Sequence, residues 1–201
     1  MKTLIQHGTI INSDDTLKTD VLVENGKIIA VGENLNATNA KTVDASGKYI
    51  LPGAIDAHTH LEMPFNGTVS ADSYFAGTRA AACGGVTTVF DFAIQRKGMS
   101  IQDIYQERNA LCKPQACVDY AFHVALTDLT DAVLDEFEDA VKAGLVSYKL
   151  FMVYKKDGLM MNDADIYRAL LRSNETGALI SVHAENPDLI DYYTEKFLKS
   201  G

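Results

Sequence analysis

The regular spacing of apolar, β-branched segments is the feature that most constrains the fold. These segments begin near Ile50, Val86, Val118, Ser147 and Ala178, at intervals of 36, 32, 29 and 31 residues, with helix-like stretches between them. Strand-then-helix units of this length are typical of βα repeats on a parallel sheet. Two architectures fit. A doubly wound open sheet of five strands is complete at this length, whereas a (β/α)₈ barrel takes roughly 250 residues and would be incomplete.

The helix-like stretches carry their own boundary signals. Residues 131–143 place acidic residues around an apolar face made of Val133, Leu134, Phe137, Ala140 and Val141. That spacing predicts an amphipathic helix. A cap at Asn162 or Asp163 predicts the start of another helix, which ends at Gly177. Pro187 suits the first turn of a last helix.

Residues 1–50 have a different pattern, one of short strands and turns. Residues 4–11 predict a strand, and two further strand segments flank Asn25-Gly26. Asn and Gly both tolerate positive φ, so this pair predicts a two-residue hairpin. This region is too small to bury a large core alone. We therefore divide the chain into a β-rich domain of residues 1–50 and an α/β domain of residues 51–201.

Charge and composition narrow the partners and the compartment. Lys and Arg number 18 against 27 Asp and Glu, a net charge of −9. An acidic surface repels phosphates and anionic lipids, so we expect neither nucleic acid nor a membrane as partner. No apolar run approaches the roughly 20 residues of a membrane span, and the N-terminus lacks the features of a signal peptide. Three cysteines without framework spacing favour a cytoplasmic location.

Candidate metal ligands stand at the ends of two strand segments. His58 and His60 follow Ile55 in the sequence I-D-A-H-T-H. Residues two apart on a strand project to one side, about 6.6 Å apart along the chain. Two imidazoles on one side can chelate a metal ion, although structural or surface roles fit this short motif equally well. His183 closes the fifth segment, and strand ends converge on one face of a parallel sheet.

Lys149 lies within an apolar strand segment, residues 146–153. Lysine is rarely buried without a partner. An edge strand or a buried ion pair would explain it structurally. A desolvated amine could instead act as a base, as a Schiff-base nucleophile or, after reaction with carbon dioxide, as a carbamate. Asp91, at the end of the second segment, could support a metal ligand, although a helix cap or a salt bridge is favoured for it. Tyr154 is a candidate hydrogen-bond donor to substrate.

These segments together resemble the cyclic amidohydrolases, specifically the hydantoinase and dihydropyrimidinase group. Residues 51–68, LPGAIDAHTHLEMPFNGT, are similar to that family's first histidine motif. Residues 147–152 resemble its carboxylated-lysine strand, and residues 181–186 resemble its third histidine motif. Residues 84–88, GGVTT, also match in order and spacing. The resemblance covers essentially the whole chain.

The resemblance implies a (β/α)₈ TIM barrel, here incomplete with about five βα units, preceded by part of a small β-sandwich. The family carries a further metal-binding histidine and an aspartate beyond the fifth strand, whereas this chain stops at Gly201. We therefore expect an N-terminal fragment that is inactive alone, poorly stable, or completed by another chain. The resemblance also implies a homo-oligomer, a tetramer in the full-length family.

The resemblance implies two zinc ions. His58 and His60 would bind one zinc, carboxylated Lys149 would bridge both, and His183 would bind the second. A metal-bridging hydroxide would attack the ring carbonyl of a small cyclic amide, a hydantoin or dihydropyrimidine, and yield an N-carbamoyl amino acid.

The resemblance assigns further residues to the substrate. Tyr154 would donate a hydrogen bond to the developing oxyanion. Met63, Phe65 and Phe151 would line the pocket for the exocyclic group of the substrate.

Other functions remain open. Dihydroorotases carry an arginine two places after the second histidine, where Glu62 stands here, which argues against that activity. An allantoinase-type cyclic amidohydrolase stays an alternative. A non-catalytic, dihydropyrimidinase-like interaction protein is another, although such relatives have lost metal ligands that this chain retains. A Schiff-base lyase using Lys149 is a third.

Overall fold

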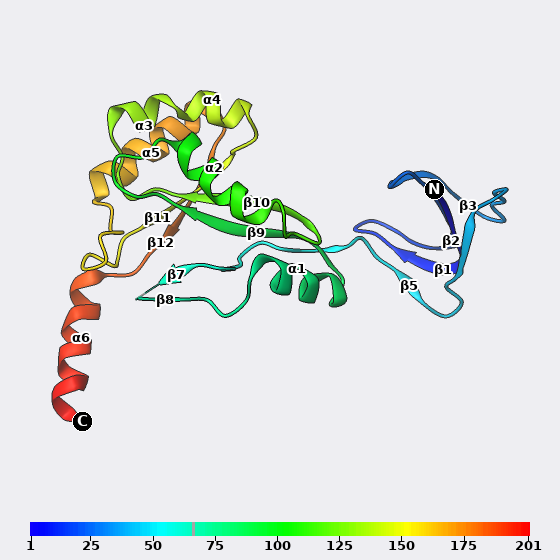
Figure 1. The fold of residues 1–201 in the computed structure, drawn as a ribbon, viewed down its shortest axis with the longest axis horizontal. Helices are drawn as coiled ribbons and strands as arrows, with labels where there is room; N and C mark the ends of the chain where they lie inside the picture. The colour runs from blue at the N-terminus through cyan, green and yellow to red at the C-terminus, as the bar shows by residue number, and fades with distance from the viewer. Residues whose placement is uncertain (66) are drawn as a thin grey trace. The chain divides into compact units, whose positions relative to one another are not determined.

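The computed structural model describes residues 1–65 and 67–201 (Figure 1). The chain forms two compact units, Met1–Gly53 and Ala54–Gly201. The boundary predicted from the sequence lies after residue 50. Asn66, within the first histidine motif, lies outside the described residues.

The first unit contains a five-stranded mixed sheet with the order β3-β2-β1-β4, and β5 also pairs with β1. Its strands are β1 (Lys2–Ile11), β2 (Thr16–Glu24), β3 (Lys27–Gly32), β4 (Lys41–Asp44) and β5 (Tyr49–Ile50). The hairpin predicted at Asn25-Gly26 is confirmed: β2 pairs antiparallel with β3, and the two turn residues have φ of 50° and 78°. The β-sandwich stays a prediction.

The second unit is built on a five-stranded parallel sheet with the order β12-β11-β10-β9-β6. Its strands are β6 (Ala54–Asp56), β9 (Val86–Ile94), β10 (Asp119–Ala125), β11 (Ser147–Phe151) and β12 (Leu179–His183). A doubly wound sheet reverses its strand order at a switch point. Here each strand pairs with the next strand of this sheet along the chain. This order indicates a partial barrel rather than a doubly wound open sheet. The total of eight units stays a prediction.

The helices of this unit are α1 (Tyr74–Cys83), α2 (Ile101–Cys112), α3 (Asp131–Asp135), α4 (Phe137–Lys142), α5 (Asp163–Thr176) and α6 (Pro187–Ser200). A side-chain cap begins each described helix of this unit except α4. The predicted boundaries of α5 are confirmed, because Asn162 caps its first turn and Gly177 ends it with φ of 78°. Pro187 occupies the first turn of α6 as predicted. A small hairpin, β7 (Pro64–Phe65) and β8 (Thr68–Val69), precedes α1.

The prediction of a single helix over residues 131–143 is wrong in one respect. The structure has two helices, α3 and α4, which meet at Glu136. The Glu136 carboxylate accepts a hydrogen bond of 2.6 Å from the backbone N–H of Ile101, so it serves the N-terminus of α2. The predicted apolar face does pack on the core, where Phe137 is fully buried.

The alternation of side chains along the strands separates the core from the site. Helices α2 to α5 cover one face of the parallel sheet (Figure 1). Tyr148 and Leu150 of β11 are fully buried on that side, and the Tyr148 ring stacks on Phe137 at 4.3 Å between ring centroids. Successive side chains point to opposite faces of a strand. Lys149, between these two residues, therefore projects from the other face.

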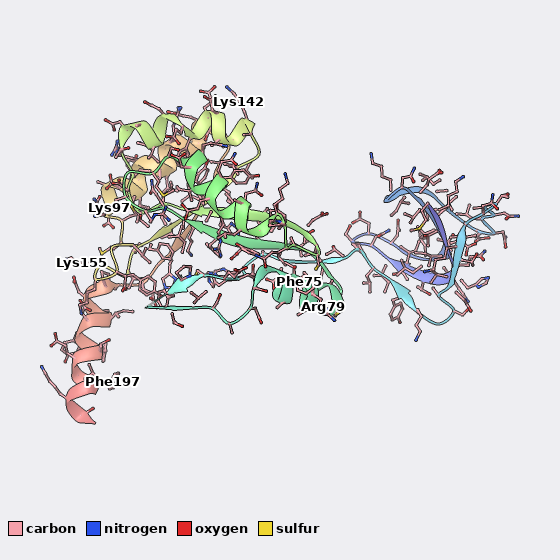
Figure 2. All side chains as sticks on the ribbon, in the orientation of Figure 1. Phe75, Arg79, Lys97, Lys142, Lys155 and Phe197 are labelled. Carbon is pink, nitrogen blue, oxygen red and sulfur yellow. The ribbon has the colours of Figure 1, made fainter. Side chains whose placement is uncertain are left out.

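Helix α6 has no buried residue, and the side chain of Phe197 projects freely from it (Figure 2). Phe197 is 64% exposed. None of the described helices is both long enough and apolar enough to span a membrane.

Candidate metal centre

His58 and His60 form a close pair just beyond the end of β6. We expect these residues on a strand, but β6 ends at Asp56 and neither histidine belongs to a strand. Their Nε2 atoms are 3.1 Å apart. Two nitrogens bound to one tetrahedral zinc at about 2.0–2.1 Å lie about 3.3 Å from each other. The measured separation is therefore closer to the ligand spacing around one metal ion than the spacing of about 6.6 Å expected on an extended strand.

Phe92 of β9 forms an apolar wall beside this pair. Its ring centroid lies 4.7 Å from that of His58 and 4.7 Å from that of His60. Although His60 is exposed by surface area, loss of solvent around the ring lowers its pKa, and the charge of His58 lowers the pKa further. A lowered pKa keeps the imidazole neutral in more acidic solution, and the neutral ring is the form that binds metal.

Lys149 is half-buried on the site face of β11. Desolvation lowers its pKa. Neither structural explanation applies. β11 lies between β10 and β12, so it is not an edge strand, and no carboxylate of the described residues pairs with the amine. The charge of Lys149 also contributes to the lowered pKa of His60.

His183, Tyr154 and Phe151 form a second group near the ends of β11 and β12. The ring centroid of His183 is 5.5 Å from that of Tyr154 and 6.2 Å from that of Phe151. The Nε2 atom of His183 lies 2.8 Å from a carboxylate oxygen of Glu185. Lys149 lies near this group, because its Nζ atom is 5.6 Å from the centroid of the Phe151 ring, and its charge also lowers the pKa of His60 in the first group.

Tyr154 has a backbone φ of 65°, in the left-handed region. A bulky side chain seldom adopts this conformation, and such residues concentrate at functional sites. The described residues contain no cluster of three or more His, Cys, Asp or Glu side chains positioned for a metal. The predicted ligands thus form a close histidine pair, a separate His183 and a lysine near both.

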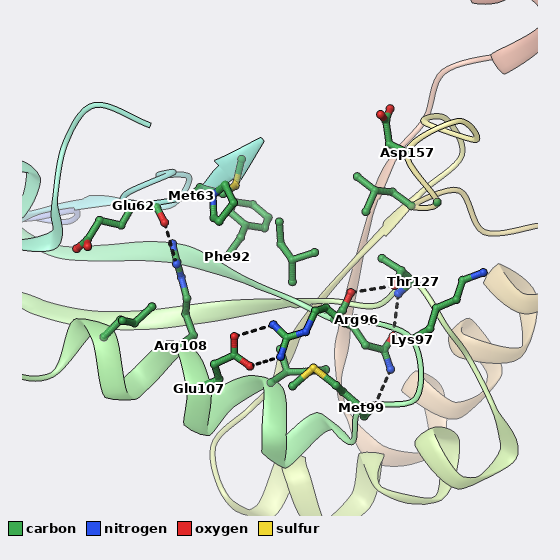
Figure 3. A pocket seen from close by; sticks show the side chains of 17 residues that line it. Glu62, Met63, Phe92, Arg96, Lys97, Met99, Glu107, Arg108, Thr127 and Asp157 are labelled. Carbon is green, nitrogen blue, oxygen red and sulfur yellow. Dashed lines mark hydrogen bonds and ion pairs between the residues drawn. The ribbon is translucent and has the colours of Figure 1, made fainter. Parts of the chain in front are cut away.

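A cavity of about 500 Å³ is lined in part by Phe92, although neither His58 nor His60 belongs to its lining (Figure 3). Phe92 lines it and also packs against both histidine rings. Of the residues predicted to contact substrate, Met63 lines the cavity, whereas Phe65, Phe151 and Tyr154 are not part of its lining. Its size is in the usual range for small-molecule sites.

A comparison with known families decides the affiliation. The profile of the Amidohydrolase family matches residues 49–201. The chain belongs to the amidohydrolase family. This family is generally metal-dependent, in agreement with the nitrogen pair that His58 and His60 present.

The relatives of this amidohydrolase chain confirm the resemblance to the hydantoinase and dihydropyrimidinase group. The D-hydantoinase of Geobacillus stearothermophilus is 43% identical, over 100% of this chain and 43% of the relative. The dihydropyrimidinase of Rattus norvegicus is 41% identical, over 98% of this chain and 39% of the relative. The crystal structure of dihydropyrimidinase from Brevibacillus agri NCHU1002 matches with a TM-score of 0.96 and 44% identity, over 100% of this chain and 44% of that one. The chain spans less than half the length of these relatives.

Arg108 and Tyr74, two members of a buried polar group around Asp91, were not predicted from the sequence. The salt-bridge interpretation of Asp91 is confirmed: this fully buried carboxylate lies 3.1 Å from Arg108 of α2. Tyr74 of α1 donates a hydrogen bond of 2.5 Å to the same Asp91 oxygen. One signal was present in the sequence, because Arg108 shares an apolar helix face with Ile104 and Cys112.

Proposed function

We propose that this chain is part of a metal-dependent hydrolase that opens the ring of small cyclic amides. The proposed substrates are hydantoins or dihydropyrimidines, and the products are N-carbamoyl amino acids. The observation that carries the proposal is the 3.1 Å separation of the His58 and His60 Nε2 atoms beside Lys149, an amine with a lowered pKa. The hydantoinases and dihydropyrimidinases among its relatives support the choice of substrate class.

The histidines of this site would hold two zinc ions. His58 and His60 would bind one ion and His183 the other, with Lys149 between them as its carbamate. When bound, the ions would polarise the ring carbonyl and lower the pKa of water in the site. The neutral imidazole favoured at His60 suits this role, because a protonated ring has no lone pair for the metal.

Lys149 would bridge the ions after reaction with carbon dioxide. The uncharged amine forms a nitrogen–carbon bond to carbon dioxide and releases one proton to solvent. The neutral side chain thereby becomes an anion with two oxygen ligands. The lowered pKa of Lys149 supports this step, since it increases the fraction of uncharged amine at neutral pH.

Tyr154 and the neighbouring apolar residues would position the substrate. The Tyr154 hydroxyl would donate a hydrogen bond to the carbonyl oxygen as negative charge develops on it. Its left-handed backbone supports a role that depends on a defined orientation. Met63, Phe65 and Phe151 would contact the exocyclic group, and Met63 already lines the cavity.

The location and assembly of the protein are also proposed here. We infer a cytoplasmic homo-oligomer, a tetramer for the whole protein, that has no nucleic-acid or membrane partner. Light scattering of the purified protein measures the mass of the assembly and so tests the predicted oligomeric state.

Metal content and ring opening test the proposed function. We expect bound zinc and hydrolysis of dihydrouracil or a hydantoin in the whole protein of which this chain is part, and we expect both to be lost in His58→Asn. The matched control is His7→Asn, because His7 is an exposed histidine of the first unit. Its backbone φ is 62°, a conformation that asparagine tolerates. Absence of metal from the wild-type protein contradicts the metal site. Metal binding without any ring opening favours a non-catalytic relative, and hydrolysis of allantoin alone favours an allantoinase.

A further inference from the structure

The two histidines proposed to bind metal lie in a short irregular segment, residues 57–62, called here the histidine segment. An irregular segment needs tertiary contacts to hold a defined geometry, because it lacks the repeating hydrogen bonds of a strand. Its centre is tied to β9, where the backbone N–H and the hydroxyl of Thr59 both donate to the carbonyl of Phe90, at 2.9 and 3.0 Å. At its start, Nε2 of His123 lies 2.9 Å from the carbonyl oxygen of Ala57.

The end of the histidine segment is held by Arg108. The Nη2 atom of its guanidinium donates to the carbonyl oxygen of Leu61. Nη1 donates to the carbonyl oxygen of Glu62 at 3.2 Å, a bond shown in Figure 3. These carbonyls directly follow His60. Arg108 thus fixes the main chain immediately after the second of the two histidines.

Two buried side chains hold Arg108 in turn. Asp91 accepts a hydrogen bond from its Nη2 atom at 3.1 Å and is fully buried. Tyr74 donates to the same carboxylate oxygen, and its ring lies 4.9 Å from the centre of the guanidinium. The guanidinium is therefore held by an ion pair at one nitrogen and by an aromatic ring beside it.

The arrangement depends on the shape of an arginine. A guanidinium presents five N–H donors in a rigid plane, so it can serve two carbonyls and one carboxylate at once. A lysine keeps the positive charge next to Asp91 but offers a single nitrogen on a flexible stem. The change Arg108→Lys therefore preserves the charge and removes the fork geometry.

We propose that Arg108, oriented by Asp91 and Tyr74, is a positioning residue that sets the geometry of His60 and so the metal affinity of the histidine pair. This inference rests on the proposed function, because it assumes that His58 and His60 bind a metal.

Metal binding by Arg108→Lys tests the inference, with Arg172→Lys as the matched control. Arg172 of α5 also donates to a main-chain carbonyl, that of Leu134 at 3.1 Å, and pairs with a carboxylate, but it is not near the histidines in sequence or contact. Zinc affinity is measured by chelator competition, and site geometry by the visible spectrum of the cobalt-substituted protein. We expect Arg108→Lys to weaken zinc binding about 10- to 100-fold and to change the cobalt spectrum. Arg172→Lys should leave both unchanged.

A second variant covers the case in which Arg108→Lys fails to fold. Tyr74→Phe retains the ring beside the guanidinium and removes only the hydroxyl that orients Asp91. We expect a smaller loss of zinc affinity in the same direction, with a changed cobalt spectrum. Wild-type affinity and an unchanged spectrum in both variants, or an equal effect of Arg172→Lys, would overturn the inference.

Hydrogen exchange of the metal-free protein separates this inference from the proposed function. We expect Arg108→Lys to accelerate amide exchange in residues 57–62 while β10 exchanges at the wild-type rate. A wild-type protein that binds no metal contradicts the proposed function, yet the exchange result still decides whether Arg108 positions the segment. Unchanged exchange in residues 57–62 would overturn the positioning role.

Discussion

At the scale of single residues, the site depends on groups whose surroundings change their protonation. Lys149 lies on an internal strand with no carboxylate partner among the described residues, and desolvation lowers its pKa. Lys142, at the end of helix α4, has the opposite pKa shift. Its hydrogen bond to Glu138 raises its pKa and keeps it cationic. Two lysines of one chain therefore differ in their readiness to react with carbon dioxide.

We predict that carbon dioxide adds to Lys149 and not to Lys142. Addition requires the uncharged amine, which the lowered pKa favours at Lys149 and the raised pKa disfavours at Lys142. Carbon-13 NMR of the protein in labelled bicarbonate should show a carbamate signal that disappears in Lys149→Arg and persists in Lys142→Arg. A signal that survives Lys149→Arg would contradict the prediction.

His60 should make the stability of the metal-free protein depend on pH. Its folded-state pKa lies below the ordinary histidine value of 6.5, chiefly through desolvation. Between these two pKa values the unfolded chain binds more protons, so the free energy of unfolding decreases as the pH falls from 6.5 toward the folded pKa. Urea unfolding at several pH values should show this slope, made shallower by His60→Asn and retained in His7→Asn. An equal slope in His60→Asn would assign the dependence to other groups.

At the scale of elements, boundaries are set by local side-chain and backbone chemistry. The Asn162 side chain accepts a hydrogen bond from the N–H of Asp165 at the start of α5. Gly177 ends this helix in the left-handed conformation, with φ of 78°. By contrast, Gly84 ends α1 with φ of −85°, a conformation that any residue adopts.

The two helix-ending glycines predict different costs of substitution. Gly177→Ala should lower the free energy of unfolding by about 1–2 kcal/mol, because the methyl group disfavours positive φ. A Cβ at Gly177 would meet no atom within 4 Å, so the cost is conformational and not steric. Gly84→Ala is the control and should change stability much less. Equal effects in urea unfolding would argue against the conformational explanation.

At the scale of the whole molecule, protection from solvent is uneven along the chain. The second unit has one continuous core that includes Phe137, Tyr148 and Leu150. Helix α5 contributes Ile166 and Ala169 to that core, whereas α6 contributes no buried residue. Stability against local opening follows buried contacts, so these two helices of equal length should behave differently.

Hydrogen exchange should distinguish the two helices in this chain. We expect the amides of α6 to exchange faster than those of α5, because opening α6 exposes no buried side chain. Mass spectrometry of peptides from residues 163–176 and 187–200 measures both rates in one sample. Equal protection would indicate that α6 is covered in solution.

Local features of this protein were determined by the sequence alone. The Asn25-Gly26 hairpin and the ends of α5 at Asn162 and Gly177 follow from residues adjacent in the chain. Each depends on backbone preferences and on side-chain hydrogen bonds within one turn, which neighbouring residues specify. The resemblance to the hydantoinase group was also present in short contiguous motifs.

Only the tertiary structure decided how distant residues combine. The periodicity of the strands was compatible with an open sheet or a barrel, and the pairing order distinguished them. The 3.1 Å approach of His58 and His60 depends on an irregular segment that no strand pattern predicts. Arg108 binds the carbonyl of Leu61 across a separation of 47 residues. Such contacts arise when packing brings separate elements together, and no local pattern encodes them.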